Sequence, residues 1–179
     1  MDKSYSQSYQ DIFALATCKN KTYIEIGGNR PKKWNNTFLL EQHGFKGFSI
    51  ERNLKWQKQW TEAGRSNPIY WDNALTFDYF KTLQDNGLSK NVGYLSCDIE
   101  PAKNTFNALK KVIQDGVEFE CITFEDDRYN ESEPYNTYAT DFLKDYGYKV
   151  AVKDVYTLDN KQLFETWFVK NDYDIKETS

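Results

Sequence analysis

The 179-residue sequence has few cysteines, no long apolar run and no excess of basic side chains. Its cysteines, Cys18, Cys97 and Cys121, form no CxxC pair, which favours reduced core thiols over a disulfide or a metal site. No apolar stretch approaches the roughly 20 residues that a membrane-spanning helix needs. The polar segment Met1–Gln10 lacks the apolar region of a signal peptide. We therefore expect a cytoplasmic protein that contacts no membrane.

The charge balance is slightly acidic, with 27 Asp and Glu against 23 Lys and Arg and a formal net charge of −4. The basic residues are scattered along the sequence. A protein that coats nucleic acid needs concentrated positive charge. We therefore expect no nucleic-acid partner. The aromatic content of 17% is high, which predicts a core built largely from Phe, Tyr and Trp.

Short apolar segments alternate with amphipathic ones, and this alternation predicts an α/β fold. A leading helix is expected within residues 1–20, over about 5–19. The core is expected at residues 22–170, and residues 1–179 are expected to form a single domain. The predicted strands lie at about 23–26, 46–50, 68–71, 92–97 and 119–124, and the predicted helices between and after them at 37–43, 54–63, 76–86, 101–116 and 137–146. A hairpin at 148–155 and 163–170 ends the pattern, so we expect seven strands in a mostly parallel sheet with helices on both faces.

The first predicted strand ends abruptly at Gly27-Gly28-Asn29. Ligands of open α/β sheets bind at the carboxyl ends of the strands, where bare backbone N–H groups can approach them. Glu25 lies within this buried strand, and a buried carboxylate needs a partner or a ligand. The turn is therefore predicted to hold a nucleoside-like cofactor.

Carboxylates lie at or just past the ends of all five predicted parallel strands, so they are expected to gather at one edge of the sheet. The positive end of a helix dipole favours acids at helix starts, which explains one or two of these carboxylates but not carboxylates at five strands in succession. The acids are Glu25, Glu51, Asp72, Asp98, Glu100, Glu125, Asp126 and Asp127.

Two kinds of ligand suit such an edge. The first is a nucleoside, whose ribose hydroxyls can donate to a carboxylate. Glu51 follows Gly27 by 24 residues, close to the spacing at which dinucleotide folds place the acid that binds ribose hydroxyls. A hard divalent cation held by Asp98, Glu100, Glu125 or Asp127 is the second. A pyrophosphate-binding GxGxxG motif is disfavoured, because Lys32 stands where its last glycine would be.

These residues, in this order, resemble class I S-adenosylmethionine-dependent methyltransferases, and within them the FkbM-type family. The resemblance covers about residues 22–170. It is carried by Glu25-Ile-Gly27, Asn36-Thr37-Phe38, Gly44-Phe-Lys-Gly47, Glu51-Arg52-Asn53, Tyr94-Leu-Ser-Cys-Asp98-Ile-Glu100-Pro101, Phe124-Glu125 and Phe142-Leu143 followed by Gly147-Tyr148.

The resemblance implies a Rossmann-like class I methyltransferase fold, S-adenosyl-L-methionine as cofactor and methyl transfer to oxygen, on a sugar, glycan or other small hydroxyl acceptor. Asp98 and Glu100 are the implied catalytic residues, because a carboxylate can take the proton of a hydroxyl. In the implied cofactor site, Glu25 and the Gly27-Gly28-Asn29 turn adjoin the methionine part, Glu51 binds the ribose and Asp72 and Ala74 flank the adenine. The same set includes Asn36, Thr37, Arg52, Asn73 and Asp98; a helix cap explains Asn36 and Thr37 nearly as well.

Three alternatives stay open at this point. A nicotinamide-dependent oxidoreductase would also place Glu51 on a ribose. A cofactor-binding module without catalysis fits Pro31 and Pro101, which stand where the family has glycine. A divalent-metal hydrolase would use the strand-end acids.

Overall fold

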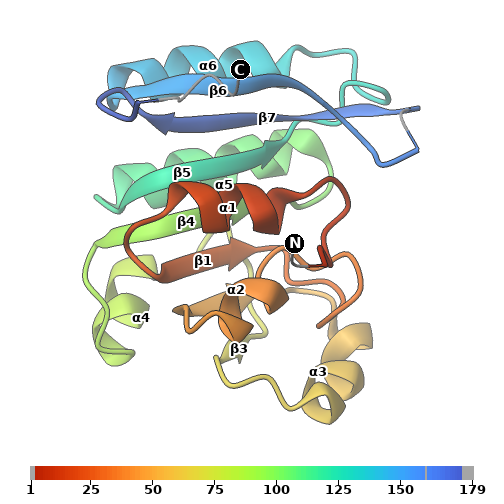
Figure 1. Ribbon diagram of the computed structural model, residues 1–179, viewed down its shortest axis with the longest axis vertical. Helices are drawn as coiled ribbons and strands as arrows, with labels where there is room; N and C mark the ends of the chain where they lie inside the picture. Colours follow the sequence, from red (N-terminus) through yellow and green to blue (C-terminus); the bar gives the residue numbers. More distant parts are fainter. Residues whose placement is uncertain (1–2, 160, 175–179) are drawn as a thin grey trace.

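A seven-stranded sheet organises residues 3–159 and 161–174, the part of the chain that the computed structural model describes (Figure 1). The strand order is β3-β2-β1-β4-β5-β7-β6. The first five strands pair in parallel, and β7 runs antiparallel to both β5 and β6. The predicted mostly parallel sheet with a closing antiparallel hairpin is confirmed. The strands are β1 (Thr22–Ile26), β2 (Lys46–Ile50), β3 (Ile69–Tyr70), β4 (Asn91–Cys97), β5 (Glu118–Glu125), β6 (Tyr148–Tyr156) and β7 (Leu163–Lys170).

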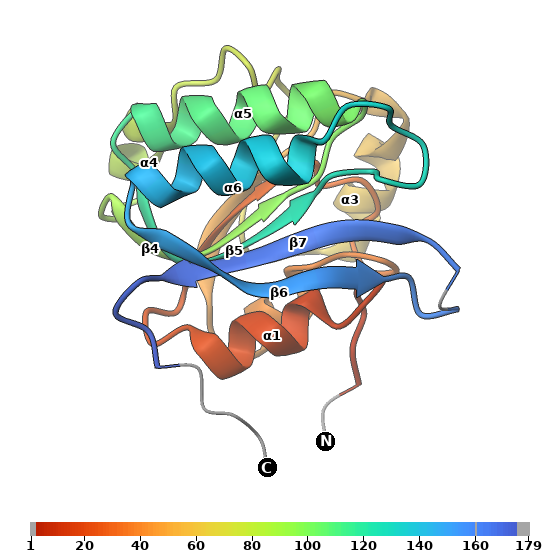
Figure 2. The same ribbon diagram turned by 90° about the horizontal axis from the view of Figure 1, so that it is seen from above.

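Helices lie on both faces of this sheet. The helices are α1 (Gln10–Thr17), α2 (Phe38–Gln42), the 3₁₀ turn η1 (Leu54–Trp56), α3 (Gln57–Ala63), α4 (Tyr79–Asp85), α5 (Ala102–Gln114) and α6 (Tyr135–Asp145). Helices α4, α5 and α6 cover one face and α1 the other (Figure 2), with α2 packed beside α1. The predicted arrangement of helices on both faces is therefore confirmed.

Apolar residues fill the spaces between these layers. The central strands β1 and β4 are buried almost throughout, as strands covered on both faces must be. The larger apolar cluster lies under α4–α6 and includes Phe48, Leu109 and Leu143. A smaller cluster under α1 and α2 includes Tyr23 and Leu40. The aromatic-rich core expected from composition is present in both.

The strand order reverses between β1 and β4, and Gly27 lies at that point. Its backbone has φ +92°, a conformation that side chains other than glycine's rarely allow. A Cβ atom there would lie 1.7 Å from the carbonyl oxygen of Asp98. Only glycine therefore lets the ends of β1 and β4 meet this closely, and a crevice opens at the carboxyl edge beside them.

Local contacts shift three predicted boundaries. The first helix begins at Gln10, not near residue 5, because the buried Asp11 carboxylate binds the Tyr5 N–H and the Ser6 hydroxyl and holds that segment as bends. The fourth helix begins at Tyr79 and is capped by Asp78, whose carboxylate accepts from the Lys81 N–H at 2.9 Å. The third strand has only the two residues of β3.

Two expectations about side chains are tested by burial. The helical spacing of Phe77, Phe80 and Leu83 predicts all three on the buried face of the fourth helix, but Phe80 is 47% exposed because the later helix start turns Tyr79 and Leu83 inward instead. Cys97 and Cys121 are buried, Cys18 is half-buried, and all three are free thiols. Among the described helices, none is long and apolar enough to cross a bilayer.

Candidate active site

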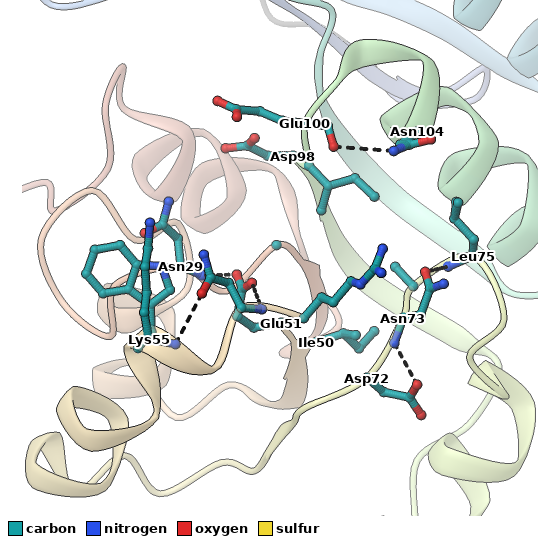
Figure 3. A pocket seen from close by; sticks show the side chains of 16 residues that line it. Asn29, Ile50, Glu51, Lys55, Asp72, Asn73, Leu75, Asp98, Glu100 and Asn104 are labelled. Carbon is teal, nitrogen blue, oxygen red and sulfur yellow. Dashed lines mark hydrogen bonds between the residues drawn. The ribbon is translucent and has the colours of Figure 1, made fainter.

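A cavity of about 550 Å³ opens at the carboxyl ends of β1, β2, β3 and β4 (Figure 3). It lies at the reversal of strand order, where the sequence predicted a ligand. Most of the predicted site residues line it. They are Gly27, Asn29, Glu51, Arg52, Asp72, Asn73, Ala74, Asp98 and Glu100.

Glu51 ties the glycine turn to the end of β2. Its Oε2 accepts from the Asn29 N–H at 2.8 Å, and its Oε1 accepts from the Asn53 N–H at 2.6 Å. Each carboxylate oxygen has a second acceptor position. A positioned carboxylate with acceptor capacity suits a pair of hydroxyl donors such as those of a ribose.

The segment after β3 forms a tight polar turn. The Asp72 carboxylate accepts from the Asn73 N–H at 2.6 Å, and the Asn73 side-chain oxygen accepts from the Leu75 N–H at 3.0 Å. Buried Ala74 is anchored because its carbonyl accepts from the Tyr79 hydroxyl at 2.8 Å. The turn therefore presents an amide and a small apolar side chain to one wall of the cavity (Figure 3).

The opposite wall carries negative charge. Asp98 and Glu100 follow β4, and their side chains lie side by side in Figure 3. Burial raises the pKa of the Asp98 carboxyl well above its usual range, and the nearby carboxylates of Glu165 and Asp127 raise it further. The pKa of Asp127 is raised to about 6, first by burial and then by Glu100. Asp98 in this wall therefore holds a proton more readily than an ordinary aspartate does.

Glu25 lies beneath the cavity and does not line it. Its carboxylate accepts from the Asn35 side-chain amide at 3.0 Å, the Thr37 hydroxyl at 3.0 Å and the Ser49 hydroxyl at 2.5 Å. Burial raises the pKa of Glu25, and the nearby Arg65 guanidinium opposes that rise. The partner that a buried carboxylate requires is thus supplied within the protein.

Gly28, Asn36 and Thr37 also lie outside the cavity lining. Asn36 donates through its amide to the Ser96 hydroxyl at 3.0 Å. Thr37 bonds to Glu25, and buried Gly28 lies against Trp60 of α3. With Glu25, these residues shape the loop under the cavity and are not part of its lining.

Sequence reasoning did not assign the remaining lining residues: Ile50, Asn53, Lys55, Trp56, Leu75, Ile99 and Asn104. Most of them adjoin a predicted site residue, so the strand-end pattern already pointed to their positions. The spacing of Trp56 and Trp60, one helical turn apart, predicts that both pack in the core. Trp60 is buried, whereas Trp56 is half-buried and borders the cavity, because the chain turns through η1 before α3 begins.

The strand-end acids are only partly brought together. Buried Asp126 turns away to pair with Arg128 at 2.7 Å and to accept from the Thr166 hydroxyl at 2.8 Å. Glu125 pairs in register with Glu165 of β7 and does not line the cavity. Across residues 3–159 and 161–174, no three His, Cys, Asp or Glu side chains are arranged to hold a metal ion.

Comparison with known proteins places the fold. Of solved structures, M. capricolum TrmK in complex with S-adenosyl-homocysteine matches with a TM-score of 0.61 at 14% identity, over 98% of this chain and 74% of that one. A rRNA methylase from Streptococcus thermophilus matches with a TM-score of 0.56 at 11% identity, over 95% and 98%. Magnesium protoporphyrin IX methyltransferase from Synechocystis PCC 6803 with bound SAM matches with a TM-score of 0.57 at 12% identity, over 89% and 76%.

The fold is that of class I methyltransferases. This confirms the predicted Rossmann-like fold. No family model matches the chain, and no curated protein matches it. The resemblance to the FkbM-type family is therefore not confirmed.

The expectation that this protein has no nucleic-acid partner is wrong. Solved structures with this fold include a rRNA methylase, so the fold serves nucleic-acid substrates as well as small molecules such as a porphyrin. An acidic total charge limits non-specific coating of nucleic acid, but it says nothing about where individual basic side chains lie.

Proposed function

We propose that this protein is an S-adenosyl-L-methionine-dependent methyltransferase. The observation that carries the proposal is Glu51, held by two backbone N–H groups at the end of β2, in a cavity that also contains the glycine turn and Asp98. The same cavity edge is where open α/β folds bind nucleotides. The neighbours of the fold, crystallised with S-adenosyl-homocysteine or SAM, support the choice of cofactor.

The residues present fit that cofactor in size and in chemistry. A cavity of about 550 Å³ lies within the range of about 300–1,000 Å³ usual for small-molecule sites. Glu51 offers acceptors for two ribose hydroxyls. The Asp72-Asn73-Ala74 turn offers an amide and a small apolar surface for adenine. Gly27, Asn29 and Asp98 adjoin the remaining space, where a carboxylate suits an ammonium group.

Arg52 lines the cavity beside Glu51, and we include it in the proposed cofactor site. Glu25, Gly28, Asn36 and Thr37 are proposed to act indirectly, by fixing the loop that carries Asn29. The Arg65 guanidinium opposes the rise that burial causes in the pKa of Glu25, and its ion-pair partner is Glu41.

The bound cofactor supplies a methyl group carried on a positively charged sulfur. The protein must then orient an acceptor hydroxyl and take its proton. Asp98 and Glu100 lie on the wall where a second molecule can enter, and we propose them as the catalytic residues. The raised pKa of Asp98 makes its ionised form a stronger base than an ordinary carboxylate.

We further propose oxygen as the methyl acceptor, on a sugar or other hydroxyl compound, as the resemblance to the FkbM-type family implies. The acidic wall supports this choice, because carboxylates accept hydrogen bonds from hydroxyls.

Calorimetric titration with S-adenosyl-homocysteine tests the cofactor half of this proposal. We expect saturable one-to-one binding. An absence of heat at millimolar ligand, with the protein folded by circular dichroism, would refute it. Transfer of a labelled methyl group tests the catalytic half. It should be abolished in Glu100→Gln while S-adenosyl-homocysteine still binds, and in Asp98→Asn, which also removes the proposed partner of the ammonium group.

A further inference from the structure

Basic and aromatic side chains alternate beside the cavity, although the sequence scatters them. The Arg30 guanidinium lies 4.8 Å from the ring centroid of Trp34 and 5.3 Å from that of Trp56. The Lys33 ammonium lies 4.6 Å from the Trp34 ring, and the Lys55 ammonium lies 4.8 Å from the Trp56 ring. We call these five residues the basic-aromatic stripe. It joins the loop after β1 to η1.

The stripe is contiguous with the cavity, because two of its members, Lys55 and Trp56, also line it. Figure 3 shows Lys55 on the side of the cavity away from Glu100. A molecule lying along the stripe can therefore extend one group across the cavity mouth toward the acidic wall.

The cations of the stripe are available to a ligand. Among residues that the structure describes, no carboxylate lies within ion-pair distance of Arg30, Lys33 or Lys55. Other exposed lysines behave differently: Lys58 and Lys81 each pair with an acid one helical turn away. In a chain with net charge −4, a group of unpaired cations beside the cavity favours an anionic partner.

Trp34 is held in an unusual position. Its backbone has φ 58°, a left-handed conformation that is uncommon for a bulky side chain. Its indole is nevertheless 52% exposed, so burial does not explain the position. Backbone strain of this kind gathers at ligand-binding sites. The conformation holds an exposed indole with two cations within 4.8 Å of its ring centroid.

We infer that the stripe binds single-stranded RNA, whose phosphates pair with the cations while a base stacks on Trp34. Alternating cations and exposed aromatic rings are the two elements by which proteins hold unpaired nucleic acid. An acidic peptide without aromatic side chains would satisfy the cations but would leave the exposed Trp34 indole without a stacking partner. The choice of RNA over DNA rests on the proposed function, since every nucleotide of an RNA strand has a free 2′-hydroxyl, whereas the internal nucleotides of DNA have no free hydroxyl.

Fluorescence anisotropy with the full chain and a fluorescein-labelled, mixed-sequence 12-nucleotide RNA tests the inference between 50 and 200 mM salt. Trp34→Ala is expected to weaken binding about tenfold through lost stacking, and Trp34→Phe to restore most of it. Lys33→Ala with Lys55→Ala should make the slope of log K against log salt shallower by about 1.4, near 0.7 per lost phosphate contact.

The matched control is Lys46→Ala with Lys90→Ala, which removes the same charge from exposed positions at the amino edge of the sheet. We expect it to leave the slope unchanged. Equal slopes in the two double variants would overturn the inference, because charge alone would then explain binding. Unchanged affinity in Trp34→Ala would also overturn it, as would displacement of the RNA by polyglutamate of equal length.

Parallel measurements separate this inference from the proposed function. RNA binding with no S-adenosyl-homocysteine binding would uphold the stripe and refute the cofactor proposal. The reverse would refute the stripe alone. With both bound, labelled methyl should pass to the RNA and not to DNA of the same sequence; equal labelling of the DNA would overturn the assignment of RNA.

Discussion

Replacing Glu51 by Gln offers the sharpest test of the cavity. The two carboxylate oxygens accept from backbone N–H groups at 2.8 and 2.6 Å and have room for two further donors. A hydrogen bond to a charged group contributes about 1.5–3 kcal/mol. Gln keeps the shape and one acceptor but places an NH₂ group where the other hydroxyl would donate. We expect a loss of about 2–3 kcal/mol, or roughly 30- to 150-fold in the dissociation constant of S-adenosyl-homocysteine.

The same substitution also disturbs the protein, because the new NH₂ faces a backbone donor at Asn29 or Asn53. A ligand comparison separates the two effects. Glu51→Gln should weaken S-adenosyl-homocysteine far more than its 2′,3′-dideoxy analogue, since only the first has the ribose hydroxyls. Coupling of this kind isolates the interaction between residue and ligand.

Isothermal titration of both ligands against both proteins provides the measurement. Glu62→Gln is the charge-matched control, because Glu62 is exposed on α3 and pairs with the exposed Lys58. It should leave both affinities within twofold. If Glu51→Gln weakens the two ligands equally, Glu51 positions the loop and does not bind the ribose. If it weakens neither, the placement of the nucleoside in this cavity is wrong.

Three further predictions concern stability, each measured by urea denaturation. Gly27→Ala should lower stability by about 3 kcal/mol or more, because its Cβ would meet the backbone after β4. Gly44→Ala, with φ +82° and open space around it, should cost about 1 kcal/mol. Equal costs would contradict the close approach of Gly27 to the backbone after β4. Arg65→Ala should cost about 3–5 kcal/mol because it leaves the buried Glu41 carboxylate without its ion-pair partner, against less than about 1 kcal/mol for exposed Lys58→Ala. Burial raises the pKa of the Glu165 carboxyl to about 7, so its protonated form contributes about 3 kcal/mol to the stability of the fold below about pH 4.5. This contribution is lost as pH rises to about 7. Glu165→Gln should flatten the pH dependence of stability, and an unchanged profile would show that Glu165 does not titrate in this range.

The sequence by itself was enough to predict the order of the elements and the edge of the sheet at which they meet. Apolar runs of strand length alternate with amphipathic segments, and that period is a local property. The glycines after β1 and the acids at the ends of β2 and β4 are local too. Their convergence follows from topology, because parallel strands joined by right-handed crossovers place their carboxyl ends together.

Helix boundaries were less predictable, and the reason lies in side-chain hydrogen bonds. Asp11 binds groups five and six residues earlier and so delays α1. Asp78 competes successfully with Thr76 for the start of α4. Either residue can cap a helix, so the sequence alone leaves the choice open, and the wrong choice rotates Phe80 from solvent into the predicted core.

Only the tertiary structure decided which acids face the cavity. Glu25 and Glu51 both mark strand ends, yet Glu25 points into a buried network with Thr37 and Ser49, whereas Glu51 borders the cavity. Side chains alternate between the faces of a strand, and a difference of one position separates burial from exposure. The same holds for charge. Contacts between residues more than twenty positions apart bring Arg30 and Trp56 together, and no count of charges along the sequence contains that information.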